Sequence, residues 1–305
     1  MSLVPFEKMI NDADAGGYAV GYFESWNLES LLAVADAAEH QWSPVILGFS
    51  GICLPDRDRV AADPLSVYAA MGLDTCHKLK VPTCLLFNES PDMKWVHDAV
   101  ELGFNFVMFS DDQLGEEQLT ASIRDLCTAA HTRGVAVEAE MASVPGLSGQ
   151  KPAVPIEDTM TDAEAACGFA KATNIDALAV NVGQQHLHGR QTVRLDLDRV
   201  AQLHDQLDVP LVLHGASSVD RGDLAEAIRL GIRKINVGSI IKQAYFGAMR
   251  DASAIVSDDD NPYEIIGSGL HNDVLMAGRL AMQTVTEDLM QLFGSAGRAG
   301  SRKRR

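Results

Sequence analysis

A regular alternation of short apolar runs with longer amphipathic segments extends along nearly the whole chain. The apolar runs have the length and composition of buried strands and cover residues 18–23, 44–49, 81–87, 104–109, 135–140, 177–182, 209–213 and 234–237. The segments between them place apolar residues at helical spacing and cover 27–38, 65–79, 92–102, 115–132, 162–172, 195–207 and a last one around Leu224. This order is typical of a parallel α/β protein. Because eight such units follow one another without a break in composition, we predict a closed (β/α)8 TIM barrel rather than an open sheet.

The rest of the chain is consistent with a single domain over residues 1–305. A further amphipathic segment, 273–292, follows the eighth unit, and we predict a helix packed outside the barrel as a cap or a subunit contact. The basic tail, about residues 298–305, is expected to be a frayed, flexible end, with a targeting or binding signal as the alternative. The long loop 142–158 is either a lid over a site or an idle surface excursion.

Charge and cysteine content limit the partners of the chain. The formal net charge of -17 argues against nucleic acid and anionic membranes. A phosphorylated substrate would therefore need a local positive centre, from a metal ion, helix N-termini or backbone amides. The five cysteines are scattered, and no apolar run approaches the ~20 residues that span a bilayer. We expect a cytoplasmic protein with free thiols.

The stretch VPLVLHGASSVDRGDLAEAIRLGIRKINVGS, residues 209–239, concentrates candidate site residues. Small residues follow each of its two strand patterns, at the strand ends where parallel α/β folds bind ligands. Gly and Ser at such ends let backbone N–H groups approach an anion. His214 stands where a metal ligand or a general base would point into the same space, although a buried histidine beside an ordinary loop fits the sequence equally well.

Several stretches resemble the class II, metal-dependent ketose-bisphosphate aldolases, especially the fructose- and tagatose-bisphosphate enzymes. The resemblance runs through nearly the whole chain in the right order. Its segments are YAVGYFESWNLE, SPVILGFSG, GVAVEAEM, TDAEAACGFAKATNIDALAVNVGQQH, LVLHGASS, KINVGS and LFGSAGRA. The resemblance implies a (β/α)8 barrel, a bound divalent metal ion and phosphorylated ketoses as substrates.

Position within these segments also implies roles for single residues. His214 matches one metal-binding histidine and His186 matches another, whereas His188 is a rival to His186 because His188-Gly189 repeats the family's His-Gly pair at a shifted register. Glu140 matches the acid of the fifth strand, and we place it with His188 behind the metal ligands.

The implied substrate contacts lie in three places. Gly215 and Ser217 match the phosphate loop after the seventh strand, and Asn236 and Ser239 match the loop after the eighth. Ser50 matches a serine that contacts the substrate.

The chain departs from the family at the residues that carry the chemistry. Family members read HLDHG at the end of the third strand, where the aspartate is the acid/base residue and the second histidine binds the metal. Here Asn88 replaces that aspartate and Glu89 replaces that histidine, while Glu24 stands at an asparagine of the first strand. An amide has no titratable proton, so Asn88 can orient a hydroxyl but cannot exchange its proton. We expect Asn88, Glu89 and Glu24 to form the catalytic set.

Together, His186, His214 and Glu89 would make a two-histidine, one-carboxylate site. Such a site accepts Zn²⁺, our prediction, as well as Mn²⁺, Co²⁺ or Fe²⁺. Two alternatives stay open. In the first, Glu89 is a base and the metal keeps two protein ligands. In the second, Glu24, Asn88 and Glu89 form a hydrogen-bonded polar layer in a protein that has lost catalysis.

The leading hypothesis is a metal-dependent aldolase-type lyase that acts on a phosphorylated ketose or a related sugar acid through a metal-bound enediolate. The first alternative is an isomerase or epimerase of a sugar phosphate that uses the same enediolate without breaking a carbon–carbon bond. The second is a non-catalytic subunit that binds a sugar phosphate or a partner. In each case we expect a homodimer or homotetramer.

Overall fold

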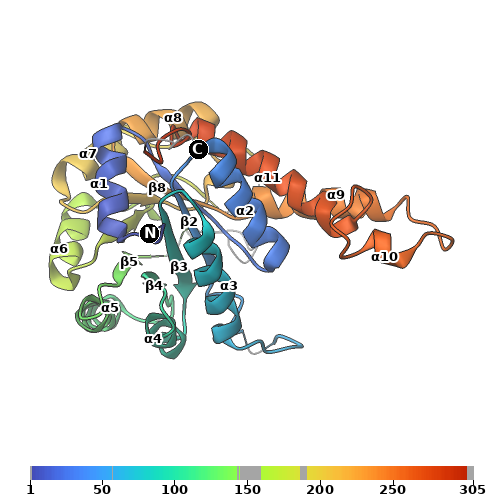
Figure 1. Cartoon of the computed structure of the whole chain (residues 1–305). Coiled ribbons are helices and arrows are strands. Elements are labelled where there is room, and N and C mark those ends of the chain that lie inside the picture. The colour runs from blue at the N-terminus through green and yellow to red at the C-terminus, as the bar shows by residue number, and fades with distance from the viewer. Residues whose placement is uncertain (1, 57, 143, 145–158, 186–190, 301–305) are drawn as a thin grey trace.

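The computed structural model describes residues 2–56, 58–142, 144, 159–185 and 191–300 (Figure 1). All eight strands form one closed barrel, in which each strand pairs in parallel with its neighbours in sequence and β1 pairs with β8. The strands are β1 Val20–Phe23, β2 Val45–Ser50, β3 Thr83–Ser90, β4 Phe106–Phe109, β5 Ala136–Glu140, β6 Ala177–Val180, β7 Leu211–Leu213 and β8 Ile232–Val237. The predicted (β/α)8 barrel is confirmed.

Helices surround the barrel and connect successive strands. They are α2 Leu28–Gln41, α3 Leu65–Lys78, α4 Met93–Glu101, α5 Glu116–His131, α6 Ala163–Thr173, α7 Leu197–Gln206 and α8 Arg221–Arg229. Local signals explain where several of them begin: the side chains of Asn27, Asp92, Asp162 and Asp196 accept hydrogen bonds from first-turn amides. The predicted lid, 142–158, lies almost entirely outside the described residues, as do residues 301–305 of the basic tail.

The helix α1, Phe6–Gly16, was not predicted, and it covers one end of the barrel. Its buried residues Phe6, Met9, Ile10 and Ala13 pack on side chains of the barrel interior. The ring of Phe6 stacks on that of Phe106 with 4.0 Å between the ring centroids. The candidate site lies at the opposite end of the barrel, where the strands finish.

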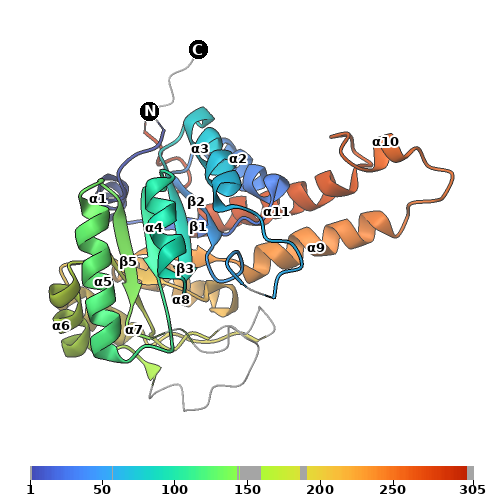
Figure 2. The same cartoon turned by 90° about the horizontal axis from the view of Figure 1, so that it is seen from below.

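The chain beyond β8 differs from the prediction in one respect. The predicted helix 273–292 is α11, Val274–Leu292, which Asp273 caps. However, the chain also forms α9, Ser239–Ser253, and α10, Pro262–Ile265, which were missed. The buried residues of α9 are only Ile241 and Tyr245. The helices α9 and α11 pack on each other and project away from the barrel with α10 near their tip, as both views show (Figures 1 and 2).

Strand register decides which side chains share the open rim of the barrel. Tyr22 of β1 lies opposite Asn236 of β8, and Ser50 of β2 lies opposite Asn88 of β3. Because successive side chains of a strand point to opposite faces, residues that pair in this way point to the same side. These inward positions therefore come together where the strands end.

Candidate active site

A cavity of about 300 Å³ opens where the strands of the barrel end. Residues from the ends of β1, β2, β3, β7 and β8 and from the start of α9 form its wall. The predicted site residues that line it are Glu24, Ser50, Asn88, Glu89, His214, Gly215, Ser217, Asn236 and Ser239. The sequence-based prediction thus identified residues that the fold brings to one place, although they come from distant parts of the chain. His186 and His188 lie outside the described residues.

Two successive residues of β3, Asn88 and Glu89, both face this cavity. Regular alternation would turn one of them outward, but the register between β3 and β4 shifts between Phe87 and Ser90. Within this bulge Glu89 has φ of +52°, in the left-handed region that residues other than glycine rarely adopt. The irregularity aims the Glu89 carboxylate at the cavity, where Asn88 Nδ2 donates to its Oε2 over 2.6 Å. Strain at such a position is typical of functional sites.

His214 is buried between two carboxylates. Its Nδ1 lies 2.9 Å from Glu89 Oε1 and its Nε2 lies 2.7 Å from Glu138 Oε1. Burial alone lowers the pKa of His214, but Glu89 and Glu138 outweigh that effect and raise this pKa to about 10. Without a bound metal ion, the two carboxylates therefore favour the protonated imidazole.

Glu138 and Lys234 were missed by the sequence analysis. Lys234 Nζ, which is fully buried, lies 2.8 Å from Glu138 Oε2 and also donates to Asn236 Oδ1. Burial alone raises the pKa of Glu138, but Lys234 and His214 outweigh it and hold that pKa below its usual value. The signal was present: Glu138 and Glu140 are two residues apart on one strand, so both point inward once β5 is recognised.

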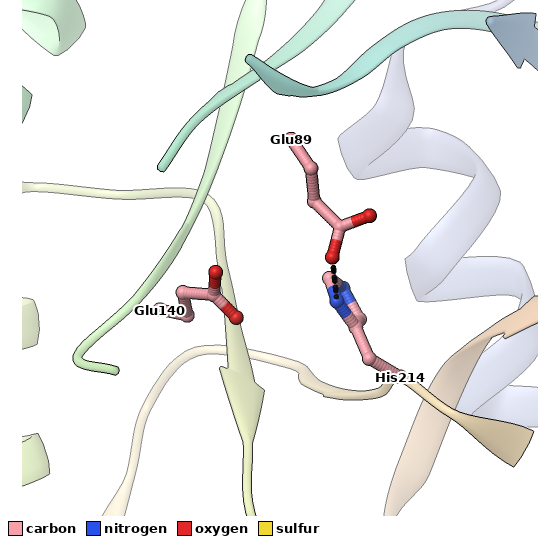
Figure 3. Close-up of side chains that lie close together, drawn as sticks. All are labelled: Glu89, Glu140 and His214. Atoms are coloured by element: carbon pink, nitrogen blue, oxygen red, sulfur yellow. Dashed lines mark hydrogen bonds and ion pairs between the residues drawn. The ribbon is translucent and has the colours of Figure 1, made fainter. Parts of the chain in front are cut away.

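Donor atoms of Glu89, Glu140 and His214 lie within 4.8 Å of one another (Figure 3). Glu140 was expected behind the metal ligands, but its carboxylate faces the same space as the other two, and Ser110 donates a hydrogen bond to its Oε1. Two carboxylates and an imidazole are a donor set that divalent cations accept, so these residues fit a metal ion. The contact between Glu138 and Nε2 agrees with this fit, because a metal-binding histidine commonly donates its other N–H to a carboxylate.

Two loops with small residues meet on the other side of the cavity. Gly215 has φ of +67°, and a short 3₁₀ turn, Ala216–Ser218, follows it. The hydroxyl of Ser217 accepts a hydrogen bond from the amide of Ile240, in the first turn of α9. Because α9 begins at Ser239, its N-terminal amides face the cavity together with the Gly215 loop. Such an arrangement favours an anion.

Glu24 forms an ion pair in the cavity wall with Lys242, a residue that the sequence analysis did not single out. Lys242 Nζ lies 2.6 Å from Glu24 Oε1 and 5.5 Å from the centroid of the Trp26 ring. Burial raises the pKa of Glu24, an effect that Lys242 opposes and Glu89 reinforces. A carboxyl group with a raised pKa is suited to exchange protons near neutral pH.

A closed (β/α)8 barrel with acidic and basic side chains and loops of small residues at the carboxyl ends of its strands is the architecture of a TIM-barrel enzyme. Comparison with known proteins narrows this class. The family model described as fructose-bisphosphate aldolase class-II matches residues 4–298, and the chain belongs to this family. It is accordingly an aldolase-type lyase that acts on a phosphosugar, and its family generally depends on a divalent metal.

Similar proteins cover nearly the whole chain. A sulfofructosephosphate aldolase of Alkalicoccus urumqiensis is 27% identical over 299 residues, which cover 98% of this chain and 99% of that one. A fructose-bisphosphate aldolase of Geobacillus stearothermophilus is 31% identical over 300 residues, with 98% and 99% covered. The crystal structure of the YdjI aldolase from Escherichia coli K12 superposes with a TM-score of 0.78 at 28% identity and covers 97% of this chain and 99% of that one. No helix in the described part of the chain is long and apolar enough to cross a membrane.

Proposed function

We propose that this protein cleaves a phosphorylated ketose by a metal-dependent retro-aldol reaction, with Glu24 as its acid/base residue. One observation carries the proposal: Glu89 and His214, whose donor atoms lie within 4.8 Å of each other and of Glu140, line the same cavity as the two loops of small residues. A sugar phosphate needs both, one for its reacting oxygens and one for its phosphate.

The phosphate would bind where the Gly215 loop meets the N-terminus of α9. Backbone amides at this point and the helix dipole favour a negative group, and the hydroxyls of Ser217 and Ser239 add donors. Lys242 Nζ adds a positive charge to the same wall, within a chain of net charge -17. Ser50 and Asn236 line the cavity from β2 and β8 and are suited to bind sugar hydroxyls.

Glu89, Glu140 and His214 would hold the divalent cation, with Zn²⁺ as our choice and Mn²⁺, Co²⁺ and Fe²⁺ as alternatives. When bound, the cation supplies a Lewis acid for the negative charge that develops on the ketose carbonyl oxygen. His186 stays a proposed further ligand and His188 its rival. Glu138 and Lys234 hold the His214 ring from the barrel interior.

The proton transfer falls to Glu24 because Asn88 has no titratable proton. The amide of Asn88 would orient the Glu89 carboxylate, to which it already donates. Burial raises the pKa of Glu24, which suits a group that accepts a proton. The proton comes from the hydroxyl on one of the two carbons whose bond breaks.

We further propose that the chain is a single domain, since one family model spans residues 4–298.

We also propose that the chain self-associates. The projecting helices expose large apolar side chains, with Phe246 67% and Tyr263 87% accessible. Light scattering on the purified protein checks this: a monomer at micromolar concentration contradicts self-association.

Metal content and product analysis test the function. The purified protein is stripped with a chelator, reloaded with Zn²⁺, and supplied with fructose 1,6-bisphosphate or with sulfofructose phosphate. We expect stoichiometric metal and release of a three-carbon phosphate only from the reloaded protein. A rearranged six-carbon product without fragments would indicate an isomerase or epimerase, and a protein that takes up no metal would contradict the proposal.

A further inference from the structure

Tyr22 places a hydroxyl inside the barrel for which the described residues offer no hydrogen-bond partner. Its side chain is 2% accessible and lines the cavity of the site. Among the described residues, its hydroxyl has no hydrogen-bond partner. A buried hydroxyl without a partner costs about 1–3 kcal/mol, so such atoms are rare unless a ligand or an ordered water satisfies them.

The position of Tyr22 in the barrel makes it part of the cavity floor. It lies on β1 two residues before Glu24, and both side chains line the cavity, so Tyr22 lies deeper in the barrel than Glu24. Its register partner is Asn236 of β8, another lining residue. Lys234 Nζ lies 5.4 Å from the centroid of the Tyr22 ring, a cation–π contact that helps hold the ring in place.

We infer that Tyr22 is a further substrate-binding residue, whose hydroxyl donates a hydrogen bond to an oxygen of the phosphorylated ketose bound in the cavity. This inference rests on the proposed function. Ketose sugars carry a hydroxyl or carbonyl oxygen on every carbon, so a ligand that fills the cavity brings an acceptor to its floor. The role is that of a donor, because burial and the nearby carboxylates of Glu24, Glu89 and Glu138 raise the pKa of Tyr22 well above its usual value.

Tyr22→Phe tests the inference, because it removes the hydroxyl and keeps the ring. The control is Tyr245→Phe, since Tyr245 is also buried but its hydroxyl accepts a hydrogen bond from Asn27 Nδ2 and it does not line the cavity. We expect Zn²⁺-loaded Tyr22→Phe to lose about tenfold to a hundredfold in kcat/KM for the substrate that the wild type cleaves. Its affinity for dihydroxyacetone phosphate, measured by calorimetry, or for the whole substrate should fall with it. The metal content should be unchanged.

The thermal stability of the free protein separates a binding role from a structural one. Free Tyr22→Phe should melt at or above the temperature of the wild type, because it loses no hydrogen bond to the described residues, whereas Tyr245→Phe should melt lower. The inference is overturned if Tyr22→Phe keeps the kcat/KM and the ligand affinity of the wild type, which would assign the hydroxyl to a water. It is also overturned if the melting temperature of Tyr22→Phe falls as far as that of the control, which would assign the hydroxyl to the fold. If the wild type itself neither cleaves nor binds any phosphorylated ketose, the proposed function fails and the inference fails with it.

Discussion

Glu138 Oε1 lies 2.7 Å from Nε2 of His214, although the two residues come from strands that are separated by β6. Because this contact engages Nε2 from inside the barrel, it leaves Nδ1 as the nitrogen that faces the cavity and the Glu89 carboxylate. The buried Lys234 contacts the other oxygen of Glu138. In the proposed metal site, the barrel interior would therefore determine which nitrogen of His214 binds the ion.

The first prediction concerns this contact. Glu138→Gln keeps the shape of the side chain but removes the charge that supports His214. We expect zinc affinity to fall about tenfold to a hundredfold, the usual effect of losing a group that orients a metal-binding histidine. Competition with a fluorescent chelator measures it. Glu226→Gln changes an exposed carboxylate and should leave the affinity as it is; an equal loss in both variants would contradict the role of Glu138.

The second prediction concerns stability. Lys234→Met removes the buried ammonium and leaves Glu138 with one cation in place of two. We expect a loss of about 3–5 kcal/mol in the free energy of unfolding, measured by urea denaturation, because breaking a buried ion pair leaves a charge uncompensated. The double variant Lys234→Met/Glu138→Gln should recover part of the loss. If the double variant is less stable by the sum of the two single effects, the two residues do not interact.

The fold could be predicted from the sequence because parallel strands buried on both faces leave continuous apolar runs. The helices α1 and α9 could not be predicted in the same way. The burial of α1 depends on Phe106 and the rest of the barrel end, while α9 has few buried residues because it projects from the barrel. For both helices the tertiary position, rather than the local pattern, decides the burial.

The site was predicted in composition more than in geometry. His214, Asn88 and Glu89 do face one cavity, as we expected from strand ends and from the family resemblance. That Asn88 and Glu89 both face it depends on a bulge and a left-handed residue, which no spacing rule predicts. The role of Lys234 was missed because a lysine in an apolar strand pattern is compatible with many positions until its partner Glu138 is placed.

The third prediction tests the anion-binding loops. Ser217→Glu places a negative charge beside the N-terminus of α9 and should abolish binding of phosphorylated ligands, because the carboxylate occupies and repels the phosphate position. Calorimetry with dihydroxyacetone phosphate measures the effect, and Ser217→Ala, which keeps the backbone amides, should bind more weakly but measurably. Unchanged affinity in Ser217→Glu would show that the phosphate binds elsewhere.

The fourth prediction concerns acid stability through the cap of α11. Asp273 is buried, and although burial alone raises its pKa, the backbone amides of Gly269 and Leu275 that donate to it outweigh this and lower the pKa. A carboxyl group whose pKa is lower in the folded than in the unfolded protein stabilises the fold at pH values above its unfolded-state pKa, which is about 3.9 for aspartate. This contribution is lost as the pH falls through the folded-state pKa. Asp273→Asn keeps a capping oxygen without the charge. It should therefore be about 1 kcal/mol less stable than the wild type at pH 7, a difference that shrinks below pH ~4. Urea denaturation at several pH values checks it; a constant difference would assign the effect to packing.

The last prediction combines the two departures from the family pattern. Asn88 Nδ2 donates to Glu89 Oε2 over 2.6 Å, so Asn88→Asp alone would place two carboxylates in contact. We expect this single variant to be less stable than the wild type and no more active on fructose 1,6-bisphosphate. Glu89→His removes the repulsion and keeps a metal ligand, so Asn88→Asp/Glu89→His should be more stable than the sum of the single effects by about 1–3 kcal/mol.

The same double variant should cleave fructose 1,6-bisphosphate faster than Glu89→His alone, because it has a titratable group where Asn88 has none. His214→Ala is the matched control: it should lose most of the bound metal by elemental analysis and all metal-dependent turnover in either background. A His214→Ala protein that keeps its metal would exclude His214 as a ligand. A double variant that keeps its metal and gains no cleavage would show that Glu24, rather than position 88, carries the proton transfer, because the Glu24–Lys242 pair in the cavity wall is unchanged by both substitutions.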